Sequence, residues 1–191
     1  MASAPDLALV LRALAFAAHK HRDQRRKDAG ASPYINHPIA VAGVLAEEGG
    51  VTDVVVLSAA LLHDTLEDTD TSITELREAF GERIAAIVAE VSDDTSLPKA
   101  ERKRLQVAGA ADLSPEARLV KLADKICNLR DMADRPPAHW DLPRRREYFD
   151  WARDVIDGLR GTHPRLEALF DEALRGKPGD VPGAMARAAG R

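Results

Sequence analysis

The chain has 191 residues, which is enough for one domain with a sizeable core but too few for two full domains. Its content of 45% hydrophobic and 30% charged residues is that of an ordinary soluble globular protein. The net charge of −4 argues against a nucleic-acid-binding protein, and no apolar run reaches the ~18–20 residues of a membrane span. The lone Cys127 excludes an intramolecular disulfide, and the N-terminus lacks the pattern of a signal peptide, so we expect a cytoplasmic protein.

Helical periodicity runs through nearly the whole chain, and we find no alternating strand pattern of useful length. The segment from Thr52 to about Glu67 is apolar on most sides, so it should form the central helix. We predict an all-α fold of about eight to ten helices, with a folded domain at 1–175 and a disordered tail at 176–191. The expected helices cover about 7–27, 38–49, 52–67, 72–80, 84–91, a segment opened by Pro98, 114–135, 143–161 and a last one around 166–170.

Four potential metal ligands lie in or beside these apolar helices. His63 and Asp64 follow an unbroken apolar run, where polar side chains are costly to bury unless something compensates them. His37 stands before Pro38 at a helix start, and Asp124 lies in a later apolar helix. Two imidazoles and two carboxylates leave open positions on a six-coordinate ion. This ligand set suits one Mn²⁺ or Fe²⁺ ion, with Zn²⁺ as a competitor.

Each ligand also has an ordinary structural interpretation. A single histidine at a helix start is more often a cap or a surface residue. A single aspartate in a helix is usually solvated or ion-paired, and Asp124 lies between Lys121 and Lys125. The joint pattern is far rarer by chance than any one of its members, so we favour the metal site.

Two acids follow the His-Asp pair at helical spacing. Glu67 is four residues after His63, and Asp68 is four after Asp64, so both share a face with the ligands if the helix continues. A carboxylate beside a metal can align water and take its proton. We therefore predict that Glu67 and Asp68 are the catalytic pair; the alternative is an acidic turn at a helix end. Asn128, four after Asp124, could contact the substrate or bond to the backbone.

These residues belong to longer blocks that resemble the hydrolase domain of the Rel/Spo stringent-response enzymes, over about residues 7–175. The pattern is similar above all to the small, hydrolase-only branch of that family, typified by the metazoan SpoT homologue. A His-Asp pair alone is shared by many HD-type phosphohydrolases, but the other blocks are more specific. The blocks are F-A-A-H-K-H-R-D-Q-R-R-K at 16–27, P-Y-I-N-H-P at 33–38, A-A-L-L-H-D-T-L-E-D-T at 59–69 and L-V-K-L-A-D-K-I-C-N-L-R-D at 119–131.

The resemblance implies an HD-domain helical fold around a single metal site. It implies a Mn²⁺-dependent hydrolase that converts ppGpp or pppGpp to GDP or GTP and pyrophosphate, with the metal and acid roles given above. Only a short segment follows residue 176, so we expect hydrolysis without synthesis. The substrate-binding residues that the resemblance implies are Arg26, Lys27, Tyr34, Lys99, Asn128, Arg144 and Tyr148.

Two other functions remain open at this stage. An HD phosphohydrolase acting on a different nucleotide, such as the 2′-phosphate of NADPH, could use the same metal and cations. A nucleotide-binding module without catalysis is the other alternative, although it would have no need of Glu67 and Asp68. For Arg22, Arg25, Arg102 and Arg104, a solvated helix face is the simpler interpretation.

Overall fold

The computed structural model describes residues 4–179, and ten α-helices make up most of this range. No strand occurs within it; Arg25 and Pro33 form an isolated antiparallel bridge. The predicted all-α fold is confirmed, whereas residues 180–191 of the predicted tail lie outside the described range. No helix in the described part is long and apolar enough to cross a membrane. The helices are α1 (Ala4–Lys20), α2 (Asn36–Gly43), the π-helical η1 (Val44–Gly49), α3 (Val54–Leu62), α4 (Thr65–Asp68), α5 (Ile73–Phe80), α6 (Glu82–Val91), α7 (Lys99–Gly109), the 3-10 turn η2 (Ala110–Asp112), α8 (Pro115–Asp134), α9 (Leu142–Asp157) and α10 (Pro164–Leu174).

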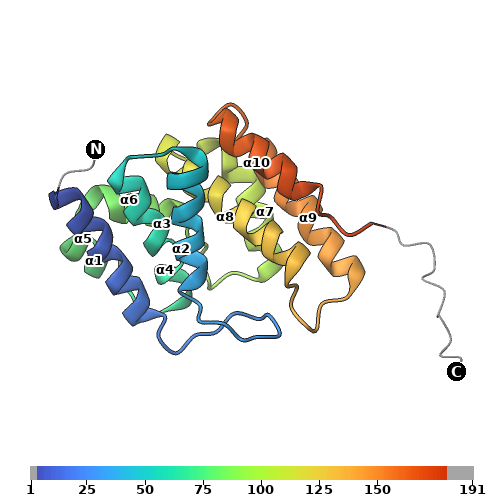
Figure 1. Ribbon diagram of the computed structural model, residues 1–191, viewed down its shortest axis with the longest axis horizontal. Coiled ribbons are helices and arrows are strands. Elements are labelled where there is room, and N and C mark those ends of the chain that lie inside the picture. Colours follow the sequence, from blue (N-terminus) through green and yellow to red (C-terminus); the bar gives the residue numbers. More distant parts are fainter. Residues whose placement is uncertain (1–3, 180–191) are drawn as a thin grey trace, which may run out of the picture.

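Helix α3 is the centre of the fold. Asp53 caps its start by accepting a hydrogen bond from the Val55 N–H at 2.8 Å. Its second half is almost entirely buried, and the helix packs against α1, α2, α6 and α8 (Figure 1). Ser114 caps the start of α8, the other helix with a long buried stretch. The polar end of α3 therefore meets the buried middle of α8 inside the protein.

The central helix ends earlier than its sequence predicts. We expected it to continue to about Glu67, but α3 ends at Leu62 and a new turn, α4, begins at Thr65. Two side chains bond to carbonyl oxygens that would accept backbone N–H groups if the helix continued. Thr65 Oγ1 donates to the Leu62 carbonyl at 2.7 Å, and His63 Nδ1 bonds to the Ala60 carbonyl at 2.8 Å. His63 and Asp64 therefore stand at a break between two helices.

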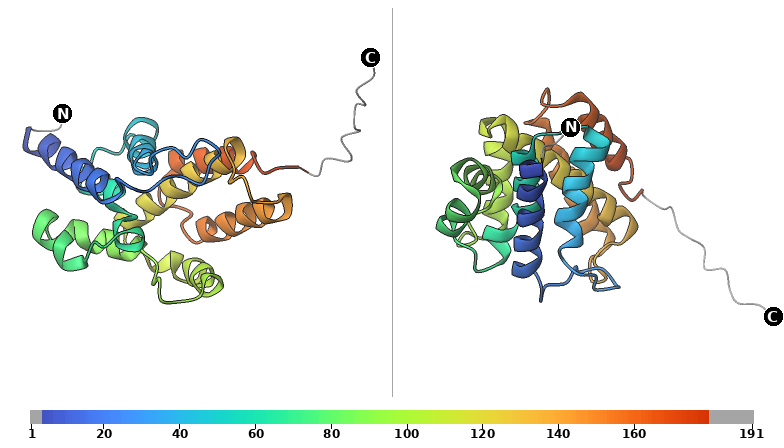
Figure 2. Two further views of the ribbon diagram at one scale, coloured as in Figure 1. Left: turned by 90° about the horizontal axis from the view of Figure 1, so that it is seen from below. Right: turned by 60° about the vertical axis from the view of Figure 1, so that its left-hand side comes forward.

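The first helix also ends early, at Lys20 in place of about Lys27. Arg22 Nη1 donates to the His19 carbonyl at 3.0 Å, and Arg25 Nη1 donates to the Arg22 carbonyl at 3.0 Å. Such contacts satisfy carbonyls that a continuing helix would use. The chain then forms a loop over residues 21–35, drawn in blue along the lower edge of Figure 1 and seen from below in the left view of Figure 2. This loop brings several of the predicted site residues to one side of α2 and α8.

Candidate metal centre and substrate cavity

Four of the predicted ligands meet in the interior, although they come from three parts of the chain. His37 lies in α2, Asp124 lies in α8, and His63 and Asp64 lie at the break after α3. One ligand atom each of His37, His63 and Asp124 lies within 4.8 Å of the others, and all three residues are buried. Asp64 Oδ2 lies 3.0 Å from His63 Nε2 and 3.8 Å from His37 Nε2. His37, His63 and Asp124 could therefore hold one ion, and Asp64 lies against the histidine nitrogens that would bind it.

The orientation of His63 fits a metal ligand. Its Nδ1 bonds to a carbonyl oxygen, which can only accept, so Nδ1 carries the proton. Its Nε2 is buried without a hydrogen-bond partner in the described protein, and it faces the carboxylates of Asp64 and Asp124. A nitrogen lone pair that faces two carboxylates is unfavourable unless a proton or a metal cation lies between them. A divalent ion meets that need, and a carbonyl bond on the far nitrogen is a usual support for a histidine ligand.

The charges of the cluster also require a cation. Burial alone would raise the pKa of Asp64, but His63 and His37 hold it below its ordinary value. Burial disfavours a charged imidazole, yet the carboxylates of Asp64 and Asp124 raise the pKa of His63 well above its ordinary value. In the protein alone, a proton on His63 compensates the acids. A divalent ion would take over that role and release that proton.

Asp124 has a second partner that the sequence had offered as an alternative to the metal. Its Oδ2 lies 3.1 Å from the buried Lys125 Nζ, while its Oδ1 lies 3.1 Å from His37 Nε2. The carboxylate thus forms an ion pair through one oxygen and faces the histidines through the other. Lys121, the other neighbour, instead donates to the Val91 carbonyl at 2.6 Å.

The two predicted catalytic acids have different surroundings. Glu67 Oε1 accepts a 2.6 Å hydrogen bond from the Asp93 N–H, and Glu67 does not line the cavity of about 480 Å³ that opens beside the cluster. Burial raises the pKa of Glu67 to about 7, with further contributions from the charges of Asp93 and Asp64. Asp68 lines the cavity. Burial of its carboxyl group, together with the charge of Asp64, raises the pKa of Asp68. Both acids are therefore easier to protonate than a surface carboxylate.

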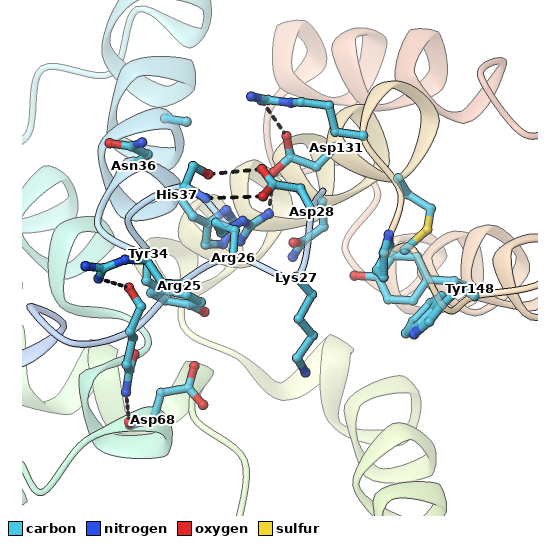
Figure 3. Close-up of a pocket in the computed structure, with 18 residues that line it drawn as sticks. Arg25, Arg26, Lys27, Asp28, Tyr34, Asn36, His37, Asp68, Asp131 and Tyr148 are labelled. Carbon is cyan, nitrogen blue, oxygen red and sulfur yellow. Dashed lines mark hydrogen bonds and ion pairs between the residues drawn. The ribbon is translucent and has the colours of Figure 1, made fainter. Parts of the chain in front are cut away.

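A cavity of about 480 Å³ opens beside the cluster, a volume in the usual range for small-molecule sites (Figure 3). The 21–35 loop forms one wall, and the end of α8 with the α8–α9 loop forms another. Lys27 extends into the opening between Asp68 and Tyr148 (Figure 3). The predicted substrate-binding residues that line this cavity are Arg26, Lys27, Tyr34, Asn128 and Tyr148.

Three of these residues also contact other parts of the site. Tyr34 donates its hydroxyl to Asp64 Oδ2 at 2.6 Å, so it supports a candidate ligand. Asn128 Nδ2 donates to Asp124 Oδ1 at 2.6 Å, which is a side-chain contact and not the backbone bond considered above. Arg26 pairs with Asp131 and lies over the Tyr34 ring at 5.7 Å.

The other two predicted cations, Lys99 and Arg144, line a second cavity of about 310 Å³. Trp140 and Tyr148 line both cavities, so the two are neighbours. Arg144 lies 4.3 Å and Lys99 5.5 Å from the centre of the Trp140 ring. Burial and the nearby cations, Arg144 first, lower the pKa of Lys99. All the predicted site residues thus lie at the metal cluster, in α4 beside it, or in these two cavities.

Sequence reasoning missed three residues that hold the site together. Gln24 reaches the turn of α4 from the 21–35 loop, His21 bonds to Gln24, and Asp131 pairs with Arg26. Lys125 entered the sequence analysis only as a possible ion-pair partner of Asp124. His21 and Gln24 lie in the block at 16–27. The cations of that block predicted phosphate binding, but its neutral side chains gave no separate signal.

Comparisons with known proteins identify the relatives of this chain. A family model described as HD domain matches residues 13–148. The guanosine-3′,5′-bis(diphosphate) 3′-pyrophosphohydrolase MESH1 of Homo sapiens is 56% identical over 170 residues, covering 89% of this chain and 93% of the relative. The protein of the same name from Mus musculus is 55% identical over 171 residues, covering 87% and 96%. A solved structure described as a metazoan ortholog of SpoT that hydrolyzes ppGpp superimposes with a TM-score of 0.86 at 48% identity, covering 92% of this chain and 96% of that chain.

Proposed function

The chain belongs to the HD domain family, and from its identity to relatives named for one reaction we infer that it is a guanosine-3′,5′-bis(diphosphate) 3′-pyrophosphohydrolase. It hydrolyses ppGpp to GDP and pyrophosphate, and pppGpp to GTP and pyrophosphate. The observation that carries this function is the buried histidine–aspartate cluster beside a nucleotide-sized cavity with cationic walls. The high identity to relatives named for this reaction, over nearly their full length, supports the same substrate class.

We propose that His37, His63, Asp64 and Asp124 hold one Mn²⁺ ion. The mixed nitrogen and oxygen donors, without a thiolate, support Mn²⁺ or Fe²⁺, and Zn²⁺ is a competitor for the same ligands. Such an ion supplies Lewis-acid chemistry: it activates water and stabilises negative charge on the phosphoryl oxygens. Tyr34 and Asn128 hold the ligand carboxylates in place through the two 2.6 Å hydrogen bonds.

The acids of α4 handle the protons. Water adds to the phosphorus next to the ribose 3′-oxygen, the bond between that phosphorus and the 3′-oxygen breaks, and pyrophosphate leaves. The water must lose a proton, and the 3′-oxygen must gain one. Asp68 faces the cavity and takes the position next to the substrate. Glu67, whose pKa is about 7, can accept and return a proton near neutral pH.

The cations of the two cavities bind the diphosphates. Among the described residues, the side chains of Lys27, Lys99 and Arg144 form no ion pair with an acid, so their charge is available to a ligand. Arg26 is already paired with Asp131, so it adds less net charge and shapes the wall beside Tyr34. Tyr148 stands where the two cavities meet and can contact the middle of the substrate.

A panel of substrates tests the function. Purified protein with Mn²⁺ should release pyrophosphate from ppGpp and pppGpp, and the guanosine products should be GDP and GTP. NADPH and deoxynucleoside triphosphates complete the panel. Release of phosphate from NADPH without turnover of ppGpp would move the protein to the other HD phosphohydrolase reaction. Binding of ppGpp without any product would leave a nucleotide-binding module.

We also propose that the protein acts in the cytoplasm. Its single cysteine is buried in α8, and burial raises the pKa of the Cys127 thiol to about 12, as suits an unreactive thiol in a reducing compartment. Imaging of the tagged protein in its own cells tests this location.

A further inference from the structure

His21 is a buried polar residue to which the reaction described above gives no role. It follows the last residue of α1, and only 1% of its surface is exposed. Its Nδ1 lies 2.6 Å from Gln24 Oε1, and its Nε2 has no hydrogen-bond partner in the described protein. Its ring centre lies 4.9 Å from that of Tyr34. Its one hydrogen bond among the described residues is therefore with Gln24, and its ring rests against that of Tyr34.

Each of these two neighbours holds one end of the turn that carries the catalytic acids. Gln24 Nε2 donates to the backbone carbonyl of Asp68, the last residue of α4. Tyr34 donates its hydroxyl to the carboxylate of Asp64, the residue before α4. A helix of four residues is unstable by itself, so contacts from outside must set its geometry. His21 touches both residues that provide those contacts.

The contact with His21 also decides which way the Gln24 amide faces. Nδ1 with its proton can only donate to Gln24, so the amide oxygen must face His21 and the amide NH₂ faces Asp68. If the amide turned over, its oxygen would face the Asp68 carbonyl oxygen, and the two would repel. Removing the donor on His21 therefore loosens the contact that holds the end of α4.

We propose that His21 is a positioning residue that places Asp68 relative to the metal cluster, acting through Gln24 and Tyr34. The proposal rests on the proposed function, because it takes Asp68 as one of the two catalytic acids. Residues that support the groups around a metal site contribute about 10–100-fold to activity. A mispositioned acid slows the chemical step, whereas the cations that bind the diphosphates stay in place.

The test separates the effect of the His21 ring, which packs on Tyr34, from the effect of its hydrogen-bond donor Nδ1. His21→Phe keeps a ring against Tyr34 and removes the donor, and Gln24→Glu keeps the acceptor for His21 and removes the donor to Asp68. With Mn²⁺ and ppGpp, each variant should lower kcat by about tenfold or more, with KM within about twofold and full metal content. His21→Asn places an amide NH₂ close to the position of Nδ1, so it should recover most of kcat. His19→Phe, at an exposed position two residues earlier, is the matched control and should leave both constants unchanged.

A double variant tests whether the two residues act along one route. His21→Phe combined with Gln24→Glu should lose no more kcat than the more damaged single variant. Losses that multiply would overturn the proposal, as would wild-type kcat in His21→Phe, or a loss of bound metal together with a raised KM. If His21→Phe does not fold, the kcat values of Gln24→Glu and His21→Asn test the proposal, since the first should be lowered and the second should stay close to that of the wild type. A wild-type protein without activity on ppGpp, or an Asp68→Asn variant with full kcat, would instead point to a failure of the proposed function or of the role of Asp68.

Discussion

The buried metal cluster and the two cationic cavities handle charge in opposite ways. In the cluster, every carboxylate lies near a histidine or a lysine, with separations of 3.0–3.8 Å. In the cavities, Lys99 and Arg144 lie beside the same tryptophan and form no ion pair among the described residues, and Lys27 points into the cavity opening (Figure 3). The cluster is a set of opposite charges in close contact, arranged so that one cation could join them. The cavities carry more cationic than acidic side chains, which suits an anionic ligand.

This difference predicts two kinds of response to mutation. A buried set of charges depends on all its members, because removing one leaves its partners desolvated and uncompensated. Exposed cations act through longer distances and solvent, so each contributes a share that salt can screen. Changes in the cluster should therefore abolish function, and changes in the cavities should weaken it by degrees.

The largest effect is expected for the metal ligands. His63→Ala and Asp64→Ala should each abolish both bound metal and turnover. Each variant removes one of four proposed ligands and leaves the charges of the remaining ligands unbalanced. Elemental analysis of the purified variants measures the metal. His19→Ala, at an exposed position, is the control. Stoichiometric Mn²⁺ in either variant would contradict the assignment of that ligand.

Glu67→Gln comes next. The variant keeps the oxygen that accepts the Asp93 N–H, so metal and ppGpp binding should be retained. Turnover should fall by roughly 10²–10⁴, the usual contribution of a positioned proton-transfer group. Single-turnover kinetics with Mn²⁺ measure this step, and Asp68→Asn is the matched comparison. Near-wild-type turnover in Glu67→Gln would leave Asp68 as the acid that handles the proton.

A smaller effect is expected in the cavities. Arg144→Ala should raise KM for ppGpp by about tenfold and change kcat less, because contacts away from the scissile bond act on substrate and transition state alike. The increase should be greater at low ionic strength than at high, since salt screens exposed charges over about 8–10 Å. Steady-state kinetics at two salt concentrations measure it.

Arg104→Ala is the control, because that arginine is exposed and paired with Glu101. A fall in kcat with unchanged KM would place Arg144 at the charge that develops on the 3′-diphosphate. Kinetics like those of the wild type would show that Arg144 is only a solvated surface residue.

The smallest effect concerns stability. In metal-free protein the pKa of Glu67 is raised from its ordinary value near 4.5 to about 7, so the folded state holds a proton that the unfolded state releases between these values. The free energy of unfolding of the wild type should therefore fall as pH rises through that window. Glu67→Gln has no such charge, so it should be more stable than the wild type above pH 7, by roughly 1–3 kcal/mol. Thermal unfolding in the presence of a chelator, from pH 5 to pH 8, measures the difference. Glu78→Gln, an exposed position in α5, should show no such trend.

Much of the fold could be predicted because helices follow local rules. The apolar run before His63 predicted a buried central helix, and α3 is buried over most of its length. Capping residues marked starts correctly, as Ser72 does for α5 and Ser114 for α8. The errors lie where a side chain competes with the backbone. Thr65 and His63 end α3, and arginine side chains end α1, although the periodicity continues past both points.

The sequence by itself determined the family, the all-α fold and the chemical types at the site, because each depends on residue identity and short spacing. Only the tertiary structure decided which charged and polar side chains pair with one another. It paired Asp124 with Lys125 and not with Lys121, left Lys99 and Arg144 without an ion-paired acid among the described residues, and joined His21 to α4 through Gln24. Such contacts join residues up to 105 positions apart, as in Arg26 and Asp131, and depend on how helices pack. Local patterns do not encode packing, because the burial and the partner of a side chain are set by the whole chain.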